Sequence, residues 1–300
     1  MKYERLNLEN IQALEENTAL CLGTFDGVHL GHQSLINKGK SLGLNIAVFV
    51  IEPDFAMFTN KNYLNSPSDQ KEIFEKLGVS HCIVATLDDK LRNLSPKEFI
   101  EKILEKLNPS AIIVGKDYRF GHFAKGDAKL LKEYFKEKID IYVMPPIMAS
   151  KDEKISTTLI KSLIKKGMIE EANEYLSREY FISGIVTKGS GVGKKLGFPT
   201  ANIEPSFPYV IPKNGVYHVK VLLNDEIKYG LVNIGHNPTI NMTDSLRIET
   251  HIFDFNANIY GEELRIYFLK FIRDEKKFSS KEELIKQLQN DLETYKNGGK

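Results

Sequence analysis

A glycine-rich stretch near the start of the chain constrains the fold more than any other feature of the sequence. It reads Leu20-Cys-Leu-Gly-Thr-Phe-Asp-Gly-Val-His-Leu-Gly-His32. Residues 18–23 are apolar enough to predict a strand that is covered on both faces. A turn rich in glycine follows, and a helix is predicted to run from the second histidine to Gly43. A strand that leads through such a turn to a helix N-terminus is typical of a phosphate-binding site in an α/β domain.

The two histidines of this turn are the first candidate functional residues. His29 and His32 lie three positions apart, so both side chains can face the same ligand. Two other interpretations stay open, namely incidental histidines and a metal-binding pair. Zinc-binding helices usually place two histidines four positions apart with a glutamate between them, and no third ligand is evident here. The other candidate nucleotide-binding residues of the turn are Gly23, Phe25, Asp26 and Gly31.

The length and composition of the chain narrow its class. A chain of 300 residues predicts two domains, and 42% hydrophobic residues are enough for packed cores. The net charge of +1 gives no electrostatic argument for a nucleic-acid partner. No signal peptide or membrane span is expected, because residues 1–10 are polar and no apolar run reaches membrane length. Cys21 and Cys82 fall in predicted core strands, so we expect free thiols and a cytoplasmic protein.

The first half of the chain alternates between predicted strands and helices. Further strands are expected at residues 45–51, 79–85, 111–114 and 139–143. Ser68 is expected to cap a helix that ends at Leu77, Ser95 begins a capping box for a helix over residues 96–107, and Asp127 caps another. This alternation predicts a parallel sheet with right-handed crossovers, in which ligands bind beyond the carboxyl ends of the strands.

Two later segments carry side chains that suit a nucleotide. The loop at residues 115–121 contains Asp117 and Arg119, and its alternative interpretation is a solvated turn with a local ion pair. The segment at residues 154–161 offers hydroxyl groups at a helix N-terminus and a cation one turn later, which suits a triphosphate but also describes an ordinary helix cap. Its candidate residues are Ser156, Thr158 and Lys161.

From Tyr180 onward the pattern changes to short alternating strands separated by turns. Strands are expected at residues 181–187, 215–223, 227–232, 247–253 and 264–271, followed by a closing helix that begins at Ser280. This spacing favours a small antiparallel β-barrel. The glycine-rich stretch at residues 188–195 does not have the spacing of a P-loop, but glycine and lysine can form a flap over phosphates, and the alternative is a simple hairpin. Thr200 and Asn202 supply the oxygen ligands that Mg²⁺ prefers.

Taken together and in order, these motifs resemble those of the bifunctional riboflavin kinase/FAD synthetase family. The strings that carry the resemblance are residues 23–32, 114–121, 155–161, 193–202, 232–239 and 247–251. The resemblance implies a Rossmann-like nucleotidylyltransferase domain at residues 1–178 and a riboflavin kinase barrel at residues 179–300. It implies that the chain uses ATP with Mg²⁺, and that riboflavin, FMN and FAD are substrates and products. From the charge and the hydropathy pattern, no nucleic-acid or membrane partner is expected.

The resemblance also implies roles for individual residues. Glu249 matches the catalytic carboxylate of the kinase, Thr200 and Asn202 match its Mg²⁺ ligands, and His29 and His32 match the histidines that stabilise the reacting α-phosphate. The implied phosphate-covering flap contains Gly189, Gly191, Gly193 and Lys194. The sequence departs from the family pattern at Asp54, Tyr118, Thr157, Lys161, Lys194 and Asn237.

Because of these departures, alternatives stay open at this point. One of the two modules could lack activity, or the chain could be a flavin-binding regulator that has lost turnover. The nucleotidylyltransferase half could also use another substrate, such as a nicotinate or pantetheine phosphate, although the attached kinase half argues against that.

Overall fold

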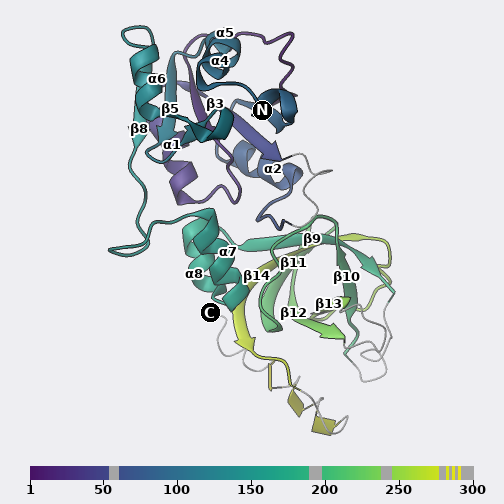
Figure 1. Cartoon of the computed structure of the whole chain (residues 1–300). Coiled ribbons are helices and arrows are strands. Elements are labelled where there is room, and N and C mark those ends of the chain that lie inside the picture. Colours follow the sequence, from purple (N-terminus) through teal and green to yellow (C-terminus); the bar gives the residue numbers. More distant parts are fainter. Residues whose placement is uncertain are drawn as a thin grey trace. The chain divides into compact units, whose positions relative to one another are not determined.

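The computed structural model describes residues 1–53, 61–188, 198–237 and 245–276, together with residues 282, 283, 286, 287, 290 and 291. It contains two compact units, Met1–Thr157 and Thr158–Lys300, and each is described by itself (Figure 1). The expected domain boundary after residue 178 stays a prediction. Within the described residues, none of the helices combines the length and the apolar character that a membrane span requires.

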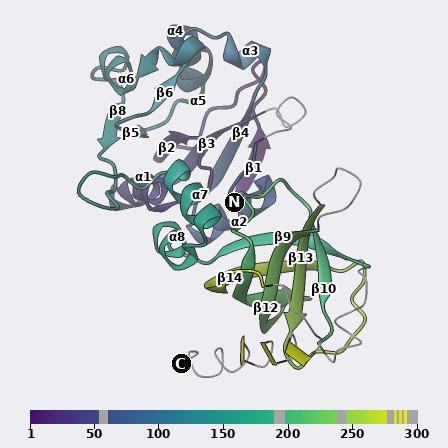
Figure 2. The ribbon, with the colours of Figure 1, turned by 60° about the horizontal axis from the view of Figure 1, so that its bottom comes forward.

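The first unit is built on a six-stranded parallel sheet. The strand order is β1-β4-β3-β2-β5-β8, and Figure 2 shows these strands side by side in that order. The strands are β1 Lys2–Arg5, β2 Thr18–Gly23, β3 Asn45–Pro53, β4 His81–Leu87, β5 Ala111–Gly115 and β8 Asp140–Met144. The predicted parallel sheet is confirmed, but the polar edge strand β1 was not predicted. Neither was a two-stranded hairpin, β6 Arg119–Phe120 and β7 Gly126–Asp127.

Helices connect the strands of this sheet. They are α1 Leu30–Ser41, α2 Pro67–Lys76, α3 Asp89–Arg92, α4 Pro96–Phe99, α5 Glu105–Leu107 and α6 Ala128–Tyr134, with a π-helical segment Ile100–Leu104 between α4 and α5. The predicted caps at Ser95 and Asp127 are confirmed. The predicted cap at Ser68 is wrong. Ser66 caps α2 instead, because its hydroxyl accepts a hydrogen bond from the backbone N–H of Asp69 while the Asp69 carboxylate accepts one from the backbone N–H of Ser66.

Successive side chains of the central strand β2 point to opposite faces of the sheet. Ala19 and Cys21 pack in a core with residues of α1 and α2, whereas Leu20 and Leu22 pack in a second core with residues of α3 to α6. Each face of the sheet is therefore covered by its own helices, as a parallel sheet requires. Cys21 and Cys82 are buried free thiols, as predicted, and burial raises the pKa of both.

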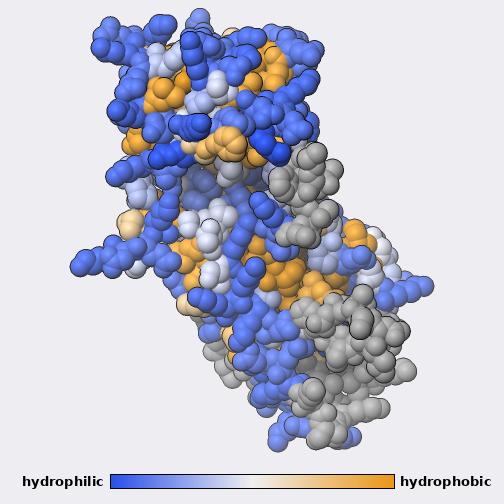
Figure 3. Space-filling model, viewed as in Figure 1, coloured by the Kyte–Doolittle hydropathy of each residue, from blue (hydrophilic) through white to orange (hydrophobic). Residues whose placement is uncertain are grey.

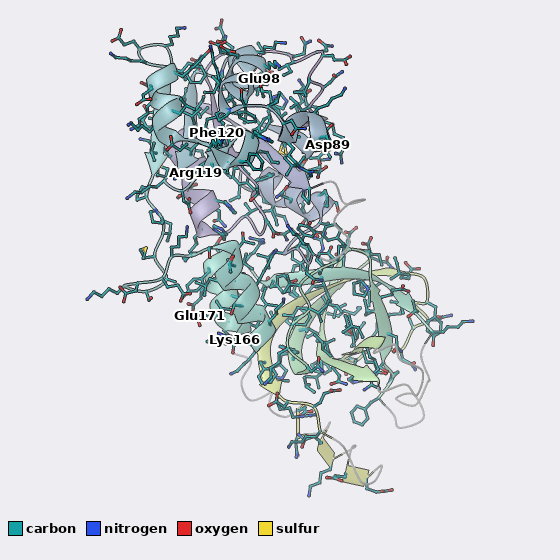
Figure 4. All side chains as sticks on the ribbon, in the orientation of Figure 1. Asp89, Glu98, Arg119, Phe120, Lys166 and Glu171 are labelled. Atoms are coloured by element: carbon teal, nitrogen blue, oxygen red, sulfur yellow. The ribbon has the colours of Figure 1, made fainter. Side chains whose placement is uncertain are left out.

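The second unit contains two helices and a closed antiparallel barrel. The helices are α7 Thr157–Lys166, whose first residue belongs to the first unit, and α8 Ile169–Leu176; Figure 4 labels Lys166 and Glu171 on them. The barrel order is β10-β13-β12-β11-β14-β9. Its strands are β9 Tyr180–Thr187, β10 Ala201–Pro205, β11 Gly215–Leu223, β12 Glu226–Asn237, β13 Ser245–Ile252 and β14 Glu263–Arg273. The barrel was predicted correctly, but strand β10 was not.

The described residues of the C-terminal segment are fixed to the barrel by a buried ion pair. Asp291 is 2% exposed, and its carboxylate accepts hydrogen bonds of 2.7 to 3.1 Å from the guanidinium of Arg273 on β14. The predicted start of the closing helix, Ser280, lies outside the described residues.

Charged and polar residues cover much of the face shown in Figure 3, and they separate the apolar surface into patches. Among the described residues, the exposed large apolar side chains include Phe123, Ile227 and Tyr260. Scattered exposure of this kind is ordinary for a folded chain. The chemistry of the molecule is therefore better sought where polar side chains converge.

Candidate functional site

The order of strands in the first unit reverses at β2. This strand lies between β3 and β5. The next strands in the sequence, β3 and β4, lie on one side of β2, and the later strands β5 and β8 lie on its other side. In open parallel sheets, ligands bind at such a switch point, beyond the carboxyl ends of the strands. The β2–α1 loop (residues 24–28) and the turn after β5 both begin at this edge, and both were singled out from the sequence.

The two histidines of the sequence motif lie against each other at the start of α1. His29 is the N-cap residue, and the centroid of its ring lies 3.7 Å from that of His32 in a stacked arrangement. A Cβ atom at Gly31 would lie only 3.0 Å from the ring of His29, so glycine leaves room for the imidazole. The prediction that both imidazoles can face one ligand is consistent with this geometry, and their chemical role stays a prediction.

Two other residues of the motif, Phe25 and Asp26, make contacts that hold the β2–α1 loop in place. Phe25 is fully buried, and its ring centroid lies 5.1 Å from that of His32. The carboxylate of Asp26 accepts a hydrogen bond of 2.8 Å from the backbone N–H of Leu64. A Cβ atom at Gly23 would lie 3.1 Å from the ring of Phe25, so the glycine lets that ring pack closely against β2.

The turn after β5 places a carboxylate beside a lysine. Asp117 forms an ion pair with Lys154, and this hydrogen bond is the main reason that the pKa of Asp117 is lowered. The side chains are 69% and 46% exposed, so solvent weakens the pair and a charged ligand could replace either partner. The short strand β6 follows, and Figure 4 labels both of its residues. Arg119 is exposed, whereas Phe120 is buried in the core.

The segment before α7 reaches the β2–α1 loop within the first unit. Thr157 begins α7, and its hydroxyl donates a hydrogen bond of 2.8 Å to the backbone carbonyl of Asp26. Ser156, the residue before it, therefore lies near the same loop. Thr158 and Lys161 continue the helix in the second unit, and their part in a phosphate site stays a prediction.

In the barrel, the candidate catalytic carboxylate stands in a row of polar side chains. Glu249 on β13 lies opposite Asn202 on β10 and, on its other side, opposite Asn233 on β12. The guanidinium of Arg247 lies 3.8 Å from the carboxylate of Glu249 and 3.8 Å from that of Glu275. The side chain of Glu249 is 22% exposed, so solvent and substrate can reach it.

A cavity of about 370 Å³ opens beside this row. Thr200 and Asn202 line it together with Thr250 and the loop residues 255–260. No cluster of three or more histidine, cysteine or acidic side chains that could hold a metal occurs among the described residues. The hydroxyl of Thr200 and the amide of Asn202 nevertheless fit Mg²⁺, because this ion prefers hard oxygen ligands and takes most of its shell from phosphates and water.

Several predicted residues lie outside the described residues. These are Gly189, Gly191, Gly193 and Lys194 of the flap, and the departure Asp54. Two polar neighbours of Glu249, namely Asn233 and Arg247, received no role from the sequence. Their place beside Glu249 depends on the register of strands that pair across many residues, and no local signal encodes that register.

Comparison with known proteins points to one family for both units. A family model described as FAD synthetase matches residues 11–159, and one described as riboflavin kinase matches residues 176–298. The chain is 37% identical to the bifunctional riboflavin kinase/FMN adenylyltransferase of Listeria monocytogenes, with 92% of this chain and 90% of the relative covered. It is 34% identical to the protein of the same name from Bacillus subtilis, with 94% and 92% covered.

A solved structure shares the fold over almost the full length. It is described as a macrolide-efflux protein from Streptococcus pneumoniae, and it is 29% identical to this chain. It matches with a TM-score of 0.90 over 99% of both chains. The chain therefore shares its fold with a solved structure, although the description of that structure names a different activity.

Proposed function

The chain belongs to the bifunctional riboflavin kinase/FMN adenylyltransferase family, and from this premise we propose which residues carry out each reaction. The protein is a transferase that phosphorylates riboflavin to FMN and adenylylates FMN to FAD, with ATP as the donor in both steps. The observation that carries the assignment is that each unit matches the family model of one activity. Macrolide efflux is not proposed, because neither family model describes it.

The kinase reaction is assigned to the barrel. We propose that the cavity beside Thr200 and Asn202 binds the nucleotide, and that these two residues hold Mg²⁺. The ion would neutralise charge on the ATP phosphates. Glu249 would accept the proton of the riboflavin 5′-hydroxyl as its oxygen attacks the γ-phosphorus, and ADP leaves. The proposed cover over the phosphates consists of Gly189, Gly191, Gly193 and Lys194.

Adenylyl transfer is assigned to the site at the carboxyl ends of strands β2 and β5 in the parallel sheet. A phosphate oxygen of FMN attacks the α-phosphorus of ATP, and the bond to pyrophosphate breaks. The attacking group is already an anion, so the reaction needs no strong base. His29 and His32 would instead stabilise charge on the five-coordinate α-phosphate. The residues proposed to position the two substrates are Gly23, Phe25, Asp26, Gly31, Asp117, Arg119, Ser156, Thr158 and Lys161.

Two further properties belong to the proposal. The finding of free, buried thiols at Cys21 and Cys82 supports a cytoplasmic location, where thiols stay reduced. Small-molecule flavins and ATP are the proposed partners, without nucleic acid or membrane.

One incubation tests the proposed function. The protein is mixed with riboflavin and ATP, with and without Mg²⁺, and the flavins are separated by chromatography. Formation of FMN followed by FAD, only when Mg²⁺ is present, is the expected result. FMN alone would mean that the adenylyltransferase site is inactive, and unchanged bound riboflavin would identify a flavin-binding regulator.

A further inference from the structure

The β2–α1 loop holds backbone conformations that are unfavourable for its residues. Phe25 has φ 53° and Val28 has φ 41°, in the left-handed region that side chains such as these rarely adopt. Such a conformation is energetically unfavourable, and it persists only where the surrounding structure enforces it. Both residues are fully buried.

Side chains from three helices bind the carbonyl groups of this loop. The amide of Gln70 on α2 donates to the carbonyl of Phe25 at 2.9 Å and to that of Thr24 at 3.4 Å. The hydroxyl of Thr157 on α7 donates to the carbonyl of Asp26 at 2.8 Å. The amide of Gln33 on α1 donates to the carbonyl of Val28 at 2.8 Å.

The loop is coupled to the histidine pair by direct packing. The ring of Phe25 packs against those of His32 and Phe74, with centroid distances of 5.1 Å and 5.4 Å. Because Phe25 is held by its backbone as well as its ring, a change in its backbone conformation would displace His32. The stacked ring of His29 would move with it.

We propose that Gln70 and Thr157 are positioning residues for adenylyl transfer. Their side chains hold the strained loop in the conformation that fixes the imidazoles, and they do so through backbone carbonyls of the protein. This inference rests on the proposed role of His29 and His32. Misplacement of reacting groups by about 1 Å can lower a rate about 100-fold. The loss of one such hydrogen bond should therefore lower kcat by a measurable amount.

The test uses two variants that each remove a hydrogen-bond donor, and each has a matched control variant. Thr157→Val keeps the shape of the side chain and removes the hydroxyl, whereas Thr157→Ser keeps the hydroxyl. Gln70→Met removes the amide at similar length, and Glu75→Gln on the exposed side of α2 is its matched control. Each variant is assayed for FAD formation from FMN and for FMN formation from riboflavin.

We expect Thr157→Val and Gln70→Met to lower kcat for FAD formation about 10- to 100-fold, with a smaller change in KM for ATP. Thr157→Ser and Glu75→Gln should stay near the unmodified protein. FMN formation should be unchanged in all four variants, since it takes place in the other unit. The imidazole NMR signals of His29 and His32 should shift in the two defective variants only.

Three results would overturn the proposal. They are an unchanged kcat in Thr157→Val and Gln70→Met, an equal loss in Thr157→Ser, or an equal loss of FMN formation. The assay of His32→Ala separates this inference from the function beneath it. If His32→Ala still forms FAD, the role of the histidines is wrong; if it does not and Thr157→Val does, only the positioning role is wrong.

Discussion

Asn202 lies directly opposite Glu249 where β10 pairs with β13. Directly opposed residues of an antiparallel pair point to the same face, with Cβ atoms about 4.5–5.5 Å apart. The proposed Mg²⁺ ligand and the proposed catalytic carboxylate therefore stand side by side on the barrel. Their places in the sequence, on strands separated by β11 and β12, give no sign of this proximity.

The first prediction concerns the carboxylate itself. Glu249→Gln should lower FMN formation at least about 100-fold, because the amide cannot accept the 5′-hydroxyl proton. FAD formation from added FMN should persist. Glu226→Gln, at the exposed start of β12, is the matched control and should have no effect on either activity. Retention of most FMN formation by Glu249→Gln would remove Glu249 from the mechanism.

The second prediction concerns the arginine between two carboxylates. Arg247 lies 3.8 Å from both Glu249 and Glu275, so its charge helps to orient the proposed base. Arg247→Met should lower kcat for FMN formation about tenfold, and Arg247→Lys should lower it less because the charge remains. Gly235→Ala should also lower it, since a Cβ atom there would clash with the Glu275 carboxylate and displace this partner of Arg247. Unchanged kcat in Arg247→Met would exclude this orienting role.

The third prediction concerns a buried hydroxyl. The hydroxyl of Tyr118 is buried and has no hydrogen-bond partner among the described residues, and burial raises its pKa. An unsatisfied buried polar group costs about 1–3 kcal/mol. Tyr118→Phe, which restores the residue of the family pattern, should therefore raise the free energy of unfolding by about 1 kcal/mol. Urea unfolding followed by circular dichroism measures this, and a lower stability would show that the hydroxyl has a partner.

The fourth prediction concerns the pH dependence of stability. The pKa of His218 is lowered from 6.5, chiefly because burial disfavours the charged imidazole; nearby Lys270 lowers it and Asp291 raises it. As the pH falls below about 6.5, the unfolded chain binds a proton that the folded barrel does not, so stability should decrease. Between about pH 7.5 and about pH 5.5, His218→Gln should lose less stability than the unmodified protein. Equal losses would contradict this assignment.

Local sequence signals predicted much of the architecture. Apolar runs predicted strands β2 and β5, and Gly43 predicted where α1 ends. The capping residues Ser95 and Asp127 predicted where two further helices begin. These signals work because a cap or an apolar run acts on its own neighbours. The cap of α2 was misplaced because two serines flank Pro67, and only Ser66 has an acidic partner three residues later.

Features that depend on distant pairing could not be predicted. Strand β10 follows a proline and ends at Pro205, so its sequence suggested a turn, and its pairing with β9 and β13 makes it a strand. The hydrogen bonds from Gln70 and Thr157 to the β2–α1 loop span 45 and 131 residues. Neither residue type carries a signal of such a contact, so only the fold identifies them.

The measurement that tests the account most directly is a complementation assay. His32→Ala should convert riboflavin to FMN and stop, and Glu249→Gln should convert only added FMN to FAD. When the two variants are mixed with riboflavin and ATP, FAD should form, because FMN released by one protein is used by the other. Failure of the mixture to form FAD, with either variant lacking both activities alone, would contradict two independent sites.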